Sequence, residues 1–315
     1  MKRLLIYMVC TSLFSGCSPD DRLLPATPAA IRFVSGVSVE VSKATGPVSG
    51  KVLLEDSRIS LLARSEQNDG TGKEILMNNL PGTVGAEGTI DYNPAKYYES
   101  GKKYVFYACW PYSVSLAYTD ATAAPSLKVG LGDRAGAQDD YLWASLEVTP
   151  HAGGSTDVSK LTFRHALCQI RVRIWNGSTA EALLNGITLT APGNGTLSLG
   201  DGSWTDIVAG ERDPGFPSFT LCRPPVPVKL PQDAFYEVSA SLLQLPVGAK
   251  AMKKQVFSIT IDGKTFKVSP STPVEGWESG HSYLYTVWYA TDGITFKGTV
   301  GPWQPVDGGS VDTEE

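Results

Sequence analysis

A long alternation of apolar residues in the middle of the chain constrains the fold most strongly. Residues 161–175 read LTFRHALCQIRVRIW, with an apolar residue at nearly every second position. Side chains of a strand point alternately to the two faces of its sheet, so this pattern predicts a strand with one buried and one solvated face. The predicted buried face consists of Ala166, Cys168, Ile170, Val172 and Ile174.

The same period recurs in short segments that are separated by turn residues. The chain has 32 glycines and 21 prolines in 315 residues, enough for many turns. Beyond the first 16 residues, no window carries the 3.6-residue stripe of an amphipathic helix. The sequence therefore predicts an all-β protein, and residues 119–140, rich in Ala, Gly and Asp, are predicted to be a long surface loop. Strands are predicted at residues 31–41, 58–63, 103–110, 141–148, 186–190, 237–243, 255–261, 264–268, 281–289 and 294–300.

The length of the chain favours two domains of ordinary size. A Gly/Ser-rich break at residues 151–157 is the predicted boundary. Short strands at regular spacing are typical of β-sandwiches, in which two sheets bury their apolar faces against each other. We therefore predict two consecutive β-sandwich domains, at residues 31–157 and 158–315.

The N-terminus is predicted to be a signal peptide, residues 1–16, followed by a lipidated tether, residues 17–30. Two basic residues precede a short apolar stretch, too short to be a stable membrane span. Small residues directly before Cys17 resemble the lipobox at which bacterial lipoproteins are cut and acylated. Acyl chains on Cys17 would anchor the protein, each buried methylene contributing about 0.8 kcal/mol. The alternative is an ordinary secreted protein in which Cys17 has no such role.

Charge and cysteine content narrow the possible partners. The formal net charge is -5 and becomes -7 once Lys2 and Arg3 leave with the signal peptide, so no nucleic-acid partner is expected. Cys109, Cys168 and Cys222 remain after processing and lipidation, and their spacing resembles no zinc motif. They are either three buried or partly buried thiols or a Cys109–Cys168 disulfide with one thiol left over.

The sequence offers no convincing catalytic or metal site, so we predict no enzyme activity, no cofactor and no metal. The three histidines, His151, His165 and His281, do not have the spacing of metal ligands, and no known nucleophile or phosphate-loop motif occurs. His165 is interpreted as a partly exposed strand residue. The adjacent Asp139 and Asp140 are interpreted as solvated charges.

A cluster of aromatic residues in the first half has two possible roles. Their rings can stack on sugars at a surface or fill a core, and their setting in a predicted strand favours the core. The cluster consists of Tyr104, Phe106, Tyr107, Trp110 and Tyr112.

Several phrases, in this order, resemble the fimbrillin family, the subunits and tip proteins of type V pili of Bacteroides-type bacteria. One is the F-x-H-A phrase formed by Phe163, His165 and Ala166, followed by alternating aliphatics. The acidic SPDD after Cys17 likewise resembles the surface-export signal of lipoproteins from such bacteria. The other phrases are SKATG at residues 42–46, the aromatic segment at 92–112, DDYLWA at 139–144 and the closing hairpin at 283–305.

The resemblance implies two transthyretin-like β-sandwich domains, export as a lipoprotein and assembly by donor-strand exchange. In such an exchange a protease cuts after the first strand, here residues 31–41, and a strand of a neighbouring subunit fills the vacated groove. The basic residue that follows this strand is Lys43, where arginine is usual in the family. Lys43 is thus either the processing site or an ordinary surface lysine, and an uncut chain would act as an anchor or accessory protein.

The function that this implies is a structural subunit, or a tip or anchor component, of a surface pilus that supports adhesion. Expected partners are other pilus subunits, the outer membrane through the lipid, and a receptor on a host or bacterial surface. The donor strand would be residues 294–300 or the tail 306–315, whose polar character favours a tip, anchor or accessory role. The alternative function is a surface glycan-binding lipoprotein with Trp110 or Trp143 as sugar contacts.

Overall fold

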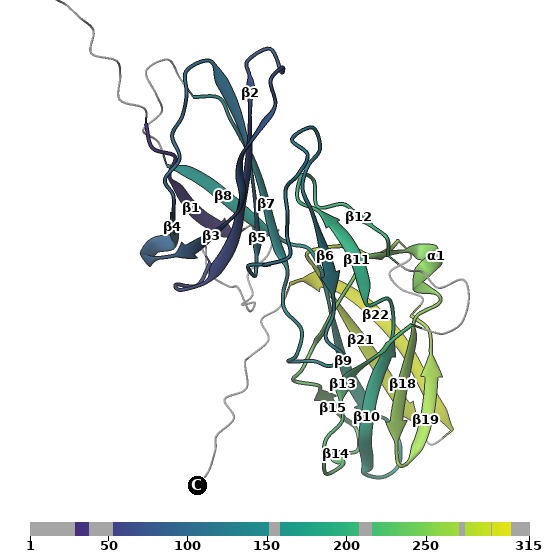
Figure 1. The fold of residues 1–315 in the computed structure, drawn as a ribbon. Coiled ribbons are helices and arrows are strands. Elements are labelled where there is room, and N and C mark those ends of the chain that lie inside the picture. Colours follow the sequence, from purple (N-terminus) through teal and green to yellow (C-terminus); the bar gives the residue numbers. More distant parts are fainter. Residues whose placement is uncertain are drawn as a thin grey trace, which may run out of the picture.

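The computed structural model describes residues 29–37, 53–150, 158–207, 216–270, 275–290 and 292–303. Within these ranges the regular secondary structure is almost entirely β-strand, which confirms the predicted all-β class. The helical elements among the described residues are two single turns, η1 (Ala86–Gly88) and α1 (Ala249–Met252). None of the helices in the described ranges is long and apolar enough to cross a membrane. Figure 1 shows an upper group of strands, β1 to β5 with β7 and β8, and a lower group that begins with β9.

The upper group is a closed barrel around one apolar core. The barrel closes because β1 pairs with β4 on one side and with β8 on the other. Ile59, Phe106 and Phe163 are among the residues that fill its interior. In order around the barrel the strands are β1 (Phe33–Val37), β4 (Thr89–Tyr92), β3 (Glu74–Val84), β2 (Arg58–Gln67), β5 (Lys102–Trp110), β7 (Leu142–Val148) and β8 (Ser159–His165).

The lower group contains two sheets that share one core, as in a β-sandwich. Ile187 and Phe257 from the first sheet and Ile174 and Tyr285 from the second belong to the same buried cluster. The first sheet has the order β13 (Ser218–Cys222), β10 (Ala182–Thr190), β18 (Val256–Ile261), β19 (Lys264–Val268), with β14 (Val228–Leu230) also on β10. The second has the order β15 (Ala234–Glu237), β9 (Cys168–Asn176), β21 (His281–Ala290), β22 (Gly293–Pro302), with β16 (Leu242–Gln244) also on β9. A short pair, β17 (Val247–Gly248) and β20 (Gly276–Trp277), lies beside them.

A third sheet connects the two groups and corrects the prediction of a surface loop at residues 119–140. Within that segment β6 (Ser126–Gly130) pairs along its whole length with β11 (Asn194–Ser198), which pairs in turn with β12 (Trp204–Thr205). Leu127 and Val129 are buried, while Ser126, Lys128 and Gly130 are exposed. The alternation is only five residues long inside a Gly- and Ala-rich stretch, so the sequence pattern did not distinguish it from a loop.

The long alternating run is two strands rather than one. β8 ends at His165 and belongs to the barrel, whereas β9 begins at Cys168 and belongs to the sandwich. The predicted buried face is confirmed, but the opposite face is not fully solvated, because Leu167 and Gln169 are also buried. The domain limits at residues 157 and 158 stay a prediction. β8 follows this predicted boundary in the sequence but pairs with β1 and β7 of the barrel.

The three cysteines after the tether are free thiols rather than partners in a disulfide. Cys109 and Cys168 are buried, and Cys222 is half-buried. Burial raises the pKa of Cys109 to about 11 and also raises the pKa of Cys168, so both remain protonated at neutral pH.

Candidate functional site

The position of the first strand is the feature with the clearest functional potential. β1 is antiparallel to β4, with Phe33 opposite Ile90, and parallel to β8, from the pair Phe33 and Ser159 to the pair Val37 and Phe163. We call the groove between β4 and β8 that β1 occupies the first-strand seat. β1 has a hydrogen-bonded neighbour on each side and is therefore not an edge strand.

Every second side chain of this segment enters the barrel core. Ile31, Phe33 and Val37 are at most 9% exposed. The ring of Phe33 meets the ring of Phe106 edge to face, with centroids 4.9 Å apart, and lies 5.8 Å from the ring of Tyr92. Burying such a side chain contributes roughly 1.5–3 kcal/mol, so the three apolar residues hold the strand firmly in its seat.

The residues just before β1 are held by hydrogen bonds of their own. The backbone N–H of Ile31 donates to the carbonyl of Lys96 at 2.8 Å, and the Tyr92 hydroxyl donates to the carbonyl of Ile31 at 2.8 Å. On the other wall, the N–H of Ser159 donates to the carbonyl of Arg32 at 2.9 Å. The seat therefore satisfies backbone groups on both sides of the segment.

Ser35 fixes the register of the strand. It is fully buried at a core-facing position, where its hydroxyl donates to the carbonyl of Gly88 at 3.1 Å and accepts from the N–H of Leu53 at 3.3 Å. A slip by one residue would leave these groups without partners and turn Phe33 away from the core. The seat thus selects one register and one pattern of side chains.

The chemistry of the seat is recognition of an extended chain. Without β1, the facing edges of β4 and β8 would present unpaired N–H and C=O groups beside an apolar floor that includes Phe106 and Phe163. Such a groove accepts another strand with apolar residues at alternate positions. The sequence predicted the first strand but not that β8 forms one wall of the seat. The alternation within residues 159–165 does not reveal that β8 pairs in parallel with β1.

The two predicted modification sites, Cys17 and Lys43, lie outside the described residues. Lys43 belongs to residues 38–52, the segment between the end of β1 and Leu53, and this whole segment is outside the described ranges. Both assignments stay predictions.

The interpretation of Asp140 as a solvated charge is wrong, because Asp140 is buried. His165 lies in β8 with intermediate exposure, as interpreted. Their side chains are each 8% exposed, and Nδ1 of His165 lies 2.9 Å from Oδ2 of Asp140. The imidazole also stacks on the indole of Trp303, with ring centroids 4.0 Å apart. Trp303 comes from the end of the chain, so a local pattern could not reveal this burial. The stack of His165 on Trp303 joins the end of β8 to the residue after β22, while Asp139 is exposed as predicted.

The aromatic cluster of the first half serves mainly as core. Tyr104, Phe106 and Tyr107 are at most 4% exposed, which confirms the favoured interpretation. Trp143, one of the two residues considered as a sugar contact, is 6% exposed and lies under the guanidinium of Arg164. Trp110, the other, is half-buried.

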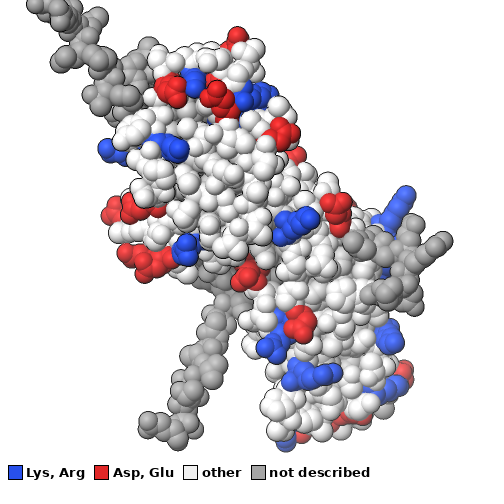
Figure 2. Space-filling model, viewed as in Figure 1, with Lys and Arg blue, Asp and Glu red and all other residues white. Residues whose placement is uncertain are grey.

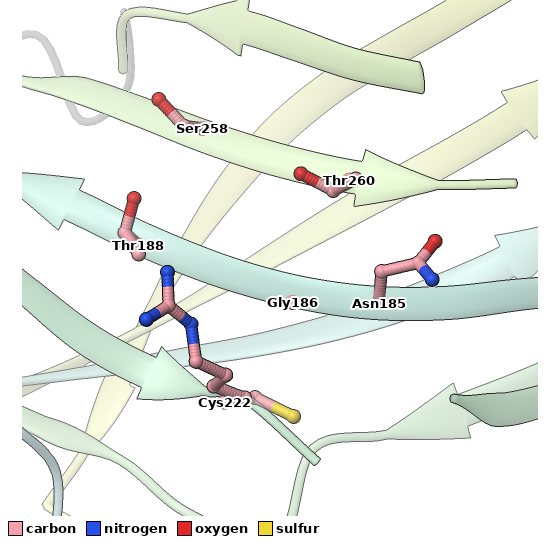
Figure 3. A pocket seen from close by; sticks show the side chains of 7 residues that line it. Asn185, Gly186, Thr188, Cys222, Ser258 and Thr260 are labelled. Atoms are coloured by element: carbon pink, nitrogen blue, oxygen red, sulfur yellow. The ribbon is translucent and has the colours of Figure 1, made fainter. Parts of the chain in front are cut away.

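A shallow pocket of about 290 Å³ lies on the sheet of β10, β13 and β18. Figure 3 shows Thr188 of β10 beside Ser258 of β18, and Gly186 of β10 beside Thr260 of β18. The described residues that line it include neither a carboxylate nor an imidazole, and burial raises the pKa of the Cys222 thiol, which disfavours a reactive thiolate. The described part of the chain also holds no cluster of three or more side chains suited to a metal ion. On the face drawn in Figure 2, positive and negative side chains are interspersed. The pocket lining is Asn185, Gly186, Thr188, Cys222, Arg223, Ser258 and Thr260.

Comparison with known proteins gives a family match and several structures of similar fold. Residues 48–303 match the model of a family described as fimbrillin-like. A fimbrial protein from Bacteroides vulgatus has a TM-score of 0.60 at 12% identity, over 87% of this chain and 99% of that one. A candidate cell adhesion protein from Bacteroides ovatus has a TM-score of 0.56 at 16% identity, over 88% and 98%. The tip fimbrial protein Mfa3 from Porphyromonas gingivalis, C-terminally truncated, has a TM-score of 0.50 at 12% identity, over 88% and 100%. No curated protein matches the chain.

Proposed function

The chain belongs to the fimbrillin-like family, and from this premise we propose that it is a lipoprotein that becomes a subunit, tip or anchor component of a surface pilus. It is exported to the outer membrane, assembles with other pilus subunits by strand exchange and supports adhesion to a host or bacterial surface. The observation that carries the proposal is the first-strand seat, in which a short N-terminal strand closes a barrel between β4 and β8.

The connection of β1 to the rest of the chain suits an exchange. β1 is joined covalently to the barrel only through residues 38–52, so a cut after Lys43 would leave it bound by its seat contacts alone. Three buried apolar side chains at roughly 1.5–3 kcal/mol each make spontaneous loss slow. Exchange therefore requires an incoming strand that refills the same core positions while β1 leaves.

Two segments are candidates for the donor strand. β22 contains the predicted residues 294–300 and lies at the end of its sheet, where its strand partner among the described elements is β21. The tail 306–315 lies outside the described residues, and its polar sequence offers few side chains for the apolar floor of the seat. A chain that receives a strand but donates poorly suits a tip, anchor or accessory position.

Processing at Lys43 is tested by replacing it. In the Lys43→Ala variant we expect no assembled protein that begins at Ala44, because a trypsin-like protease requires a basic residue at the cut. N-terminal sequencing of protein from sheared surface filaments gives the result, and Lys51→Ala, a change in the same connection, is the matched control. Wild-type assembled protein that begins before Ile31 would contradict processing at this site.

Lipidation at Cys17 is tested in the same way. The Cys17→Ala variant should lose all incorporation of an alkyne-labelled palmitate and should keep residues 1–16, because cleavage and acylation depend on this thiol. The label is read by in-gel fluorescence after membrane fractionation, with Cys10→Ala in the signal peptide as control. Equal labelling of the Cys17→Ala variant and the wild type would exclude Cys17 as the acylated residue.

A further inference from the structure

A row of aromatic side chains crosses the sheet of β15, β9, β21 and β22. Phe235 of β15 pairs with Trp175 of β9, and Trp175 pairs with Trp288 of β21, which is opposite Thr295 of β22. Residues in cross-strand register point to the same face of a sheet. Phe235, Trp175 and Trp288 therefore lie side by side, and we call them the aromatic row.

The aromatic row faces away from the core of the sandwich. The residues next to it in sequence, Ile174 and Val287, point inward and are fully buried. Phe235 is 50% exposed, and both tryptophans are only half-buried. The rings of Trp175 and Phe235 have centroids 4.8 Å apart. Contiguous exposed aromatic side chains on one face of a sheet are typical of an interaction site.

The two long sides of the row differ in chemistry. On one side the guanidinium of Arg173 lies 4.7 Å over the ring of Phe235, and its Nε donates to the Thr286 hydroxyl at 2.8 Å. This anchors the arginine beside the rings and leaves its remaining N–H groups as donors. On the other side the next cross-strand pair is Ala290 and Gly293, which are small. The row is thus an apolar strip with N–H donors along one border and small residues along the other.

The size of the strip argues against a protein as its occupant. A standard protein interface covers about 800 Å² on each partner. A fully buried aromatic side chain contributes roughly 150–250 Å², and these three are already partly covered. Strands lie about 4.8 Å apart, so the row spans roughly 10 Å across three strands. This is suitable for a short stretch of a thin, elongated ligand.

We propose that the aromatic row binds a polysaccharide chain. A sugar ring has an apolar C–H face, which packs on an aromatic face, and a rim of hydroxyls, which pair with the donor border. That border consists of Arg173 and the exposed Lys297, which is the cross-strand partner of Thr286. The row lies on a different sheet from the first-strand seat, so the inference does not depend on strand exchange. It would give a pilus component direct contact with surface glycans.

The test uses the full mature chain on a glycan array, followed by native affinity electrophoresis in gels that contain the polysaccharide bound best. We expect saturable binding, at least a tenfold loss of affinity in Trp175→Ala and Trp288→Ala, and a smaller loss in Trp175→Phe, which keeps a ring. Titration should also shift the tryptophan fluorescence of the wild type. Tyr97→Ala, which removes a 50% exposed aromatic from the barrel, should bind normally.

The Phe235→Ala variant tests the row in a protein that still folds, because the side chain of Phe235 is half exposed and its removal leaves the core intact. A folded Phe235→Ala variant with full affinity, or the absence of saturable binding to the array, would overturn the proposal. A change of oligomeric state on sedimentation in the row variants, without any effect on glycan binding, would show instead that the row is a contact between subunits.

Discussion

The Phe33→Ala variant should unfold with a free energy about 3–5 kcal/mol lower than that of the wild type. Phe33 is 2% exposed, and its ring meets those of Phe106 and Tyr92, so its removal leaves a cavity that these neighbours cannot fill. Domains are typically stable by only about 5–15 kcal/mol. One truncation in the seat would thus remove a large part of the total.

The matched control is Val34→Ala. Val34 belongs to the same strand but is only half-buried and faces away from the core, so we expect a much smaller loss of stability. Urea denaturation measures the difference, and hydrogen exchange at the amides of β8 reports whether β1 detaches before the barrel unfolds. Equal losses in the two variants would mean that Phe33 does not anchor the strand.

Locking β1 in its seat with a disulfide should abolish incorporation into filaments. Val34 and Thr89 are cross-strand partners in the antiparallel pair of β1 and β4. Such partners have Cα atoms about 4.5–5.5 Å apart, within the range that a disulfide spans. In the Val34→Cys/Thr89→Cys variant, a cut at Lys43 would still leave β1 covalently bound. We expect less than about a tenth of the wild-type amount of this protein in filaments sheared from oxidised cells, with recovery after reduction.

The control places a cysteine pair where no exchange is proposed. Thr260→Cys/Thr265→Cys joins β18 and β19, which are also antiparallel partners with solvent-facing side chains. This variant should assemble normally in both redox states. Cys109 and Cys168 are buried with raised pKa values and should not compete for the engineered disulfides. Normal assembly of the oxidised β1–β4 variant would show that β1 does not leave this seat.

Local patterns predicted many strands but not their neighbours. Alternation and turn residues located β5 and β7 almost to the residue. β6 was missed because its two buried residues lie in a stretch with the composition of a loop. The sequence does place Trp175 on the arginine-bearing face of the alternating run, which predicts that its side chain faces away from the core. Its position beside Trp288 and Phe235 depends on pairings between distant segments.

The sequence by itself determined that this chain is all-β, because the alternation of side chains along a strand is a local property that five to ten residues display. Only the tertiary structure decided that β1 lies between β4 and β8, that His165 meets Asp140 and Trp303, and that three aromatic residues form one row. A period of two tells which face of a strand is buried but not which strand lies next to it. That choice depends on the hydrogen bonds and buried area of the whole barrel and sandwich, summed over residues far apart in the chain.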